Sequence, residues 1–145
     1  MAAPELQELL VPDASGWRDW LLAHHAGAPG IWLVLNKAGD TVTELTYELA
    51  VEEAVCFGWI DGQARRREGG GTLIRMTPRR PRSNWSVSNV DRVERLDGEG
   101  RMHAAGWAAV EVARANGLWG AAVAKRDASR ADMTQGPEGS PPGPA

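Results

Sequence analysis

Apolar residues recur three or four positions apart in four stretches of this chain, which predicts four amphipathic helices. Residues 31–35, IWLVL, form an unbroken apolar run that is typical of a strand buried on both faces. Two further segments, 59–66 and 72–77, flank a turn of one glutamate and three glycines, which predicts a β-hairpin. We therefore expect an α+β fold in which a small, three-stranded, mostly antiparallel sheet packs against about four helices.

The two ends of the chain lack this periodicity. Residues 1–12 are acidic and end at Pro12, so we expect a loosely held N-terminal arm. Residues 127–145 hold four prolines and three glycines, and their largest aliphatic side chain is Met133. Such a segment cannot bury enough apolar surface to become ordered. The expected organisation is a single domain over residues 13–126, followed by a disordered tail over residues 127–145.

Short polar side chains precede the predicted helices and can cap their free N–H groups. The candidate caps are Asp13 or Ser15 for the first helix, Thr46 for the second, and Ser83, Ser86 or Ser88 for the third. Gly58 is placed to end the second helix in a left-handed conformation. The glutamates of that helix, Glu48, Glu52 and Glu53, are expected on its solvent side. In the first strand of the hairpin, the two-residue period places Trp59, Asp61, Gln63 and Arg65 on one face.

Composition adds two features to this pattern. The chain has seven tryptophans, one phenylalanine and one tyrosine, and an indole suits both a core and a ligand pocket because it joins a flat apolar face to an N–H donor. The net charge is −3, yet residues 61–82 carry seven arginines and only two acidic residues. We call residues 61–82 the basic segment.

Several classes of protein are excluded or disfavoured. No apolar run approaches the about 18 residues of a membrane span, and the first residues carry acidic side chains where a secretory signal carries basic ones. Cys56, the one cysteine, excludes an internal disulfide framework and a cysteine-rich zinc site. His24, His25 and His103 do not have the spacing of metal ligands, and HExxH, GxSxG and GxxxxGK[ST] do not occur. We expect a cytoplasmic protein without membrane insertion, catalytic residue, metal or cofactor.

The most informative motif is TPRRPRSNWS, residues 77–86, where three arginines precede the hydroxyl groups at the start of a predicted helix. Guanidinium groups and the free N–H groups of a helix N-terminus both bind phosphate and carboxylate. Trp59, Asp61 and Trp85 flank the motif, so a pocket with indole walls forms if the hairpin meets the third helix. The predicted ligand-binding residues are Trp59, Asp61, Arg79, Arg80, Arg82, Ser83, Trp85, Ser86 and Asn89.

Three other interpretations fit the same residues. The arginines can belong to a solvated loop in which they pair with Asp61, Asp91 and Glu94. Asp61 can act as the base of an enzyme for a phosphorylated or glycosidic substrate, with the arginines stabilising charge. The basic segment can also bind single-stranded nucleic acid with Trp85 as a stacking platform, although the negative charge of the rest of the chain repels a polyanion.

Three strings, AVCFGWIDGQ, RMTPRRPRSNWSVSNVDRVERL and EGRMHAAG, resemble the YdeI/OmpD-associated family of bacterial proteins, also described as bacteriocin-protection proteins. The resemblance covers about residues 20–119. It implies a role in stress or antimicrobial protection, with no catalytic activity and no cofactor. Members continue into a basic helical region where this chain has its Pro/Gly-rich tail, so we expect either a truncated member or one with a frame-shifted end. We expect a non-enzymatic protection protein that binds a small anionic or phosphorylated ligand. The family is sometimes described as periplasmic, whereas the sequence favours the cytoplasm.

Overall fold

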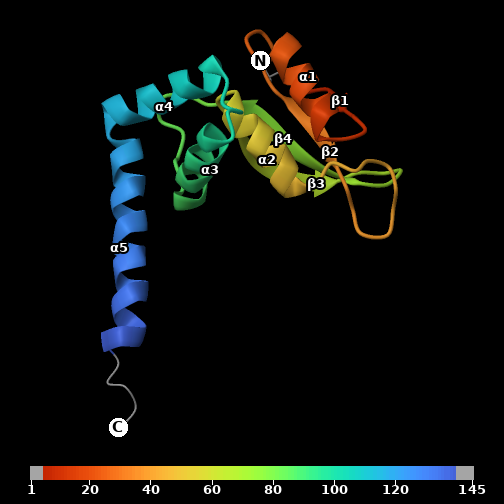
Figure 1. Cartoon of the computed structure of the whole chain (residues 1–145). Helices are drawn as coiled ribbons and strands as arrows, with labels where there is room; N and C mark the ends of the chain where they lie inside the picture. The colour runs from red at the N-terminus through yellow and green to blue at the C-terminus, as the bar shows by residue number, and fades with distance from the viewer. Residues whose placement is uncertain (1–4, 140–145) are drawn as a thin grey trace.

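The computed structural model describes residues 5–139, with side chains to Asp132, and shows five helices and a four-stranded mixed sheet in this part of the chain (Figure 1). The strands are β1 (Glu8–Leu9), β2 (Ile31–Leu35), β3 (Trp59–Arg66) and β4 (Thr72–Pro78), in the order β1-β2-β4-β3. The helices are α1 (Ala14–His24), α2 (Tyr47–Cys56), α3 (Val87–Gly98), α4 (Ala104–Asn116) and α5 (Leu118–Gly139). The α+β class is confirmed, as are the central strand β2 and the hairpin β3–β4.

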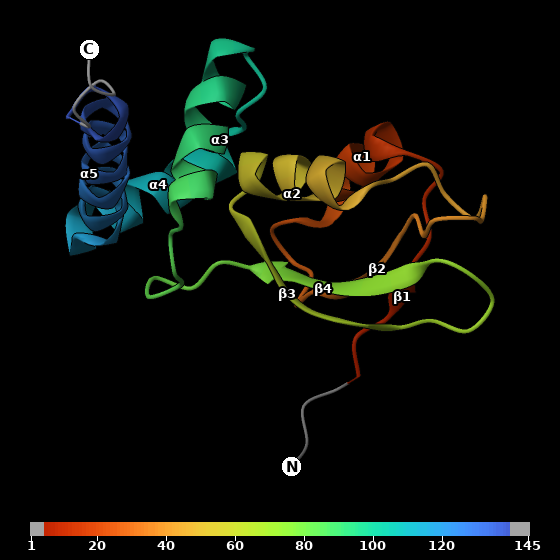
Figure 2. The ribbon, with the colours of Figure 1, turned by 90° about the horizontal axis from the view of Figure 1, so that it is seen from below.

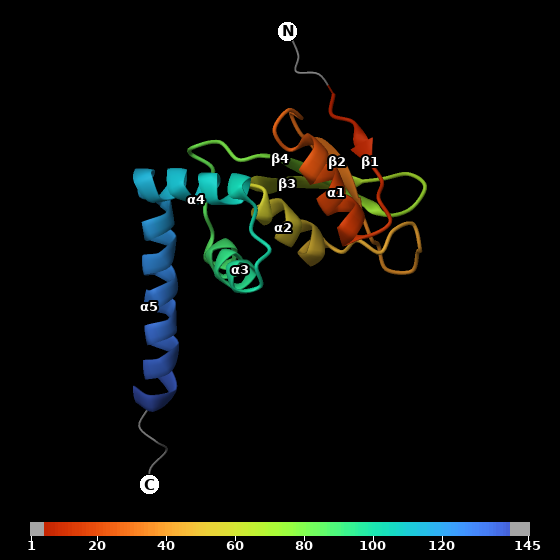
Figure 3. The same cartoon turned by 45° about the horizontal axis from the view of Figure 1, so that its top comes forward.

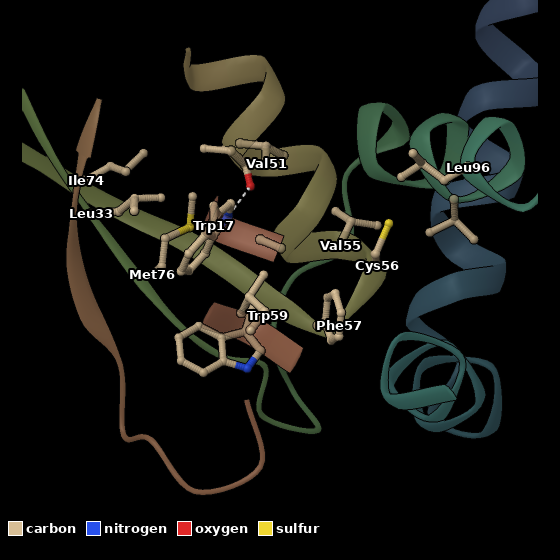
Figure 4. Packing of buried hydrophobic residues seen from close by; sticks show 14 of the residues in the cluster. Trp17, Leu33, Val51, Val55, Cys56, Phe57, Trp59, Ile74, Met76 and Leu96 are labelled. Atoms are coloured by element: carbon tan, nitrogen blue, oxygen red, sulfur yellow. Dashed lines mark hydrogen bonds between the residues drawn. The ribbon is translucent and has the colours of Figure 1, made fainter. Parts of the chain in front are cut away.

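The helices form two groups around the sheet. α1 and α2 cover one face, whereas α3, α4 and α5 lie beside the sheet at the end where β4 leads into α3 (Figures 2 and 3). Trp17 of α1 is fully buried, and its indole N–H donates a 3.0 Å hydrogen bond to the carbonyl of Ala50 on α2 (Figure 4). This bond links the two helices. On the opposite face, Trp32, Val34 and Leu73 form a smaller buried cluster. β2 is therefore buried on both faces, as its sequence predicts.

The expectation of a loose arm over residues 1–12 is wrong for the described part of that arm. Glu8 and Leu9 pair in parallel with β2, and the Trp32 N–H donates to the Gln7 carbonyl at 2.8 Å. Leu6 packs on the cluster around Trp32. The free edge of β2 supplies these hydrogen bonds, and a strand of two residues is too short to leave a periodic signal. β1 makes the sheet four-stranded and mixed where the sequence predicted three mostly antiparallel strands. Residues 1–4 lie outside the described residues.

The expected disordered tail also differs from the structure, because α5 continues through residues 127–139. The buried Arg126 side chain donates to Glu94 on α3 at 2.6 Å, and Arg130 donates to Asp91 on α3 at 3.0 Å. Charged contacts therefore join α5 to α3, and a search of the sequence for apolar periodicity does not detect such contacts. Residues 140–145 of the expected tail lie outside the described residues.

The caps of three helices follow the sequence, with Asp13, Thr46 and Ser86 each accepting a backbone N–H at the helix start. Gly58 ends α2 with φ +75°, also as predicted. Glu48 lies on the solvent side of α2 as predicted, but the prediction is wrong for Glu52 and Glu53, which are only 7% and 6% exposed. Arginines from α1, α3 and the α3–α4 loop surround these two glutamates and cover them.

The predicted common face of β3 is wrong as well. The pairing of β3 with β4 shifts between Asp61 and Ala64, and one extra residue reverses which face the later side chains occupy. Trp59 consequently packs in the core under the helices, whereas the Arg65 guanidinium lies on the other face, 4.0 Å from the centroid of the Trp32 ring.

Candidate functional site

The loop between β4 and α3 carries most of the predicted site residues, and backbone hydrogen bonds fix its shape. The Arg79 N–H donates to the Gly58 carbonyl at 2.9 Å, which holds the start of the loop beside the end of α2. The Arg80 N–H donates to the Ser83 hydroxyl at 2.8 Å and closes a turn. At the end of α4, the Asn116 side chain donates to the Pro81 carbonyl at 2.6 Å. With the fixed φ of its prolines, the loop presents its arginines from a restrained backbone.

The Arg79 guanidinium is held on two sides. Its central carbon lies 3.8 Å from the centroid of the Trp85 ring, and Nη1 donates to the Asn84 carbonyl at 2.7 Å. Trp85 is 7% exposed, and its ring meets Trp119 edge-on at 5.3 Å. The other two nitrogens of Arg79, Nε and Nη2, are buried without a hydrogen-bond partner among the described residues. Nε and Nη2 form the edge of a guanidinium that, in proteins generally, can bind two oxygens of a phosphate or carboxylate.

The charge of Arg79 is also uncompensated. Burial lowers the pKa of Arg79 to about 10, and the negative charge of Asp61 offsets only part of this effect. Arg18 and Arg101 are partly buried too, but each pairs with Glu53 and its pKa is raised despite burial. An unpaired charge in a buried position is costly, so Arg79 is a place where a counter-ion would stabilise the protein.

The ion pairs of the whole described chain show the same contrast. Every arginine outside the basic segment has a carboxylate partner in the part of the chain that the structure describes. Inside it, Arg65 and Arg67 pair with Glu5 and Glu8. Among the described residues, the arginines without such a partner are Arg66, Arg75, Arg79, Arg80 and Arg82. In the alternative of a solvated loop, the expected pairing with Asp61, Asp91 and Glu94 is wrong, because Asp61 accepts from Tyr47 and the other two bind arginines of α5. Arg80 and Arg82 are nevertheless exposed, as that alternative expects.

Two hollows adjoin the loop. The first, of about 100 Å³, lies between the loop and α4 and is lined by Arg79, Arg80, Pro81, Trp85, Ala109 and Val112. The second, of about 490 Å³, is more open and is lined by Pro29, Arg75, Thr77, Pro78, Arg79 and Arg80. Arg79 and Arg80 line both, and among the described residues no acidic side chain lines either.

The structure brings together Arg79, Arg80 and Trp85, and it gives several other predicted site residues contacts inside the fold. Trp59 is 1% exposed and donates to the His25 carbonyl at 3.3 Å. The Ser86 hydroxyl caps α3 by accepting the Asn89 N–H at 3.1 Å. The buried Asn89 side chain accepts a 2.8 Å hydrogen bond from Arg92.

The remaining predicted residues lie closer to solvent. The Ser83 hydroxyl closes the turn of the loop, and Arg82 is exposed. The Asp61 carboxylate accepts a 2.8 Å hydrogen bond from the Tyr47 hydroxyl. None of these three side chains lines either hollow.

Seven lining residues were not predicted, namely Pro29, Arg75, Thr77, Pro78, Pro81, Ala109 and Val112. Arg75 and Thr77 alternate with Met76 on β4, and the two-residue period places them on the same face as Arg79, a signal the sequence does contain. Ala109 and Val112 reach the first hollow through the packing of α4, for which the local sequence gives no signal. Within the described residues, no cluster of histidine, cysteine and acidic side chains could hold a metal ion. None of the described helices combines the length and apolar character needed to cross a membrane.

Comparison with protein families finds one match. The family described as a domain of unknown function, DUF8412, matches residues 9–109. No curated protein and no solved structure matches the chain. The matched range begins at the end of β1 and reaches Ala109 in α4, so it includes the whole β4–α3 loop.

Proposed function

This chain belongs to the family of the domain of unknown function DUF8412, and we propose that it binds a small anionic or phosphorylated ligand through Arg79, Arg80 and Trp85. The observation that carries the proposal is the buried edge of Arg79, whose two N–H groups have no acceptor among the described residues. A buried donor without an acceptor and a buried cation without a counter-charge both cost free energy, and one anion removes both costs.

The surroundings of Arg79 support binding of a small ligand. Trp85 holds the guanidinium against its ring, so little side-chain freedom is lost when the ligand binds. Arg80 is exposed and lines the same hollow of about 100 Å³, which adds a second positive charge beside a small space. The absence of acidic lining residues leaves acceptor atoms to be supplied by the ligand.

We propose that this binding is non-enzymatic and serves stress or antimicrobial protection, as the resemblance to bacteriocin-protection proteins implies. Asp61, the candidate base of the enzymatic alternative, is bonded to Tyr47 and lines neither hollow, which weakens that alternative. The burial of Trp85 beneath Arg79 and beside Trp119 likewise weakens its role as a stacking platform for single-stranded nucleic acid.

Titration calorimetry with inorganic phosphate at constant ionic strength tests the proposal. We expect the wild-type protein to bind phosphate, and Arg79→Gln to weaken binding roughly 10- to 150-fold, the usual effect of losing a charge-assisted contact. Arg66→Gln is the matched control, because Arg66 also lacks a carboxylate partner but lies at the far end of the hairpin from the loop. Without phosphate, Arg79→Gln should unfold at the same temperature as wild type or higher, since it removes an uncompensated buried charge. No binding by wild type at millimolar phosphate, or equal losses in the two variants, would contradict the proposal.

A further inference from the structure

We infer that the ligand carries two adjacent phosphate groups, one bound at Arg79 and the other at Arg75 and Thr77. This inference rests on the proposed function and extends it to a class of ligand. Its basis is the second hollow, of about 490 Å³, which shares Arg79 and Arg80 with the first and adds Arg75 and Thr77.

The position of Arg75 and Thr77 on β4 directs both toward the same anion. Residues two apart on a strand project from one face at about 6.6–6.8 Å intervals, and the ladder continues to Arg79, whose N–H bonds Gly58. Arg75, Thr77 and Arg79 therefore form a row along β4 and the residue after it, and all three line the second hollow. Arg75 is exposed and has no carboxylate partner among the described residues.

The chemistry of the lining favours phosphate over carboxylate. The hollow is lined by the arginines Arg75, Arg79 and Arg80 and by the hydroxyl-bearing Thr77. A carboxylate has only two oxygens to accept these donors, whereas each phosphate group has at least three. No acidic side chain lines the hollow, so the site suits a diphosphate without a bound divalent cation.

Calorimetric titrations with inorganic phosphate and with pyrophosphate, at equal ionic strength and with a chelator present, test the inference. We expect Arg75→Gln to weaken pyrophosphate binding about 5- to 10-fold and phosphate binding less than about twofold, because the second phosphate group alone would contact Arg75. Arg79→Gln should weaken both ligands. Arg66→Gln should weaken neither by more than about twofold, which controls for the greater charge of pyrophosphate.

The outcomes separate the two proposals. If phosphate binding depends on Arg79 but Arg75→Gln changes the two ligands equally or changes neither, the second phosphate site is wrong and the anion site stands. If wild type binds neither phosphate nor pyrophosphate, the proposed function itself fails. Equal effects of Arg75→Gln and Arg66→Gln on pyrophosphate would show attraction by overall charge and overturn the inference.

Discussion

Replacing Arg101 by methionine is expected to lower the free energy of unfolding by about 2–4 kcal/mol. Arg101 lies in the α3–α4 loop and contacts both buried glutamates of α2, with its nitrogens 3.1 Å from a Glu52 oxygen and 2.8 Å from a Glu53 oxygen. Burial acts to lower the pKa of Arg101, but hydrogen bonds and negative charge from Glu99, Glu53 and Glu52 outweigh it and raise that pKa. The loop is thus fastened to α2 by charge.

The magnitude follows from what the substitution leaves behind. The side chains of Glu52 and Glu53 are 10% and 7% exposed, and each would lose one donor while keeping another, Arg95 for Glu52 and Arg18 for Glu53. A buried acceptor left unsatisfied costs about 1–3 kcal/mol, so two would cost about 2–6 kcal/mol, and the remaining partners Arg95 and Arg18 hold the expected loss to about 2–4 kcal/mol. The Arg101 side chain is 30% exposed, so water can enter the space it vacates and reduce this cost.

Urea unfolding near neutral pH, followed by tryptophan fluorescence and circular dichroism, measures the effect. Arg130→Met is the matched control, because Arg130 is 60% exposed and its ion pair joins it to Asp91, itself 45% exposed. Such surface pairs change stability by at most about 0.5–1 kcal/mol. Similar unfolding midpoints for the two variants, with unchanged dependence on urea, would refute the reasoning about the buried glutamates.

Two further substitutions test the position of α4. A Cβ on Gly106 would lie 2.3 Å from the Cys56 carbonyl oxygen, a backbone atom that cannot rotate away. Gly106→Ala should therefore lower the free energy of unfolding by about 1–3 kcal/mol. It should also weaken phosphate binding, because α4 must shift to relieve the clash. Gly120→Ala, with nothing within 4 Å of its Cβ, is the control, and equal stability of the two variants would contradict this packing. His103 caps α4 by accepting the Ala105 N–H at 3.0 Å, and burial together with the positive charges of His25 and Arg18 lowers the pKa of His103. As pH falls below about 6.5, the imidazole of His103 takes up a proton more readily in the unfolded chain than in the folded one, so wild type should lose stability. The variant His103→Asn keeps a cap but has no imidazole, so its stability should fall less. Melting temperatures of the two proteins that stay parallel from about pH 7.5 to 5.5 would contradict this.

The elements that the sequence predicted are those whose stability has a local, periodic cause. The five consecutive apolar residues of IWLVL predict a strand buried on both faces, and all five are buried in β2. The hairpin is predicted by the glycines of its turn. The missed elements depend on contacts between distant segments. β1 exists because the edge of β2 is free to pair, and α5 meets α3 through Arg126 and Arg130, whose carboxylate partners lie more than 30 residues earlier. Neither kind of contact has a period in the sequence.

The candidate site divides in the same way. The motif TPRRPRSNWS located the loop, because a run of arginines between prolines is visible without a structure. Which arginine would be buried could not be predicted, since the burial of Arg79 depends on Trp85 and, behind it, Trp119 of the unpredicted α5. Ser86 has two predicted roles. Its cap on α3 is confirmed, because its hydroxyl accepts the Asn89 N–H, whereas its contact with a ligand stays a prediction.

The arrangement around Asp61 explains how Arg79 stays charged without forming an ion pair among the described residues. Burial and the carboxylate of Asp61 raise the pKa of the Tyr47 hydroxyl, so this hydroxyl stays protonated. It donates a 2.8 Å hydrogen bond to Asp61. In the described chain Asp61 forms no ion pair with Arg79. Burial lowers the pKa of Arg79 to about 10, and the charge of Asp61 offsets part of this effect. The guanidinium therefore stays protonated near neutral pH. Asp61 therefore supports the charge of Arg79 from a distance and leaves Nε and Nη2 of Arg79 without an acceptor among the described residues.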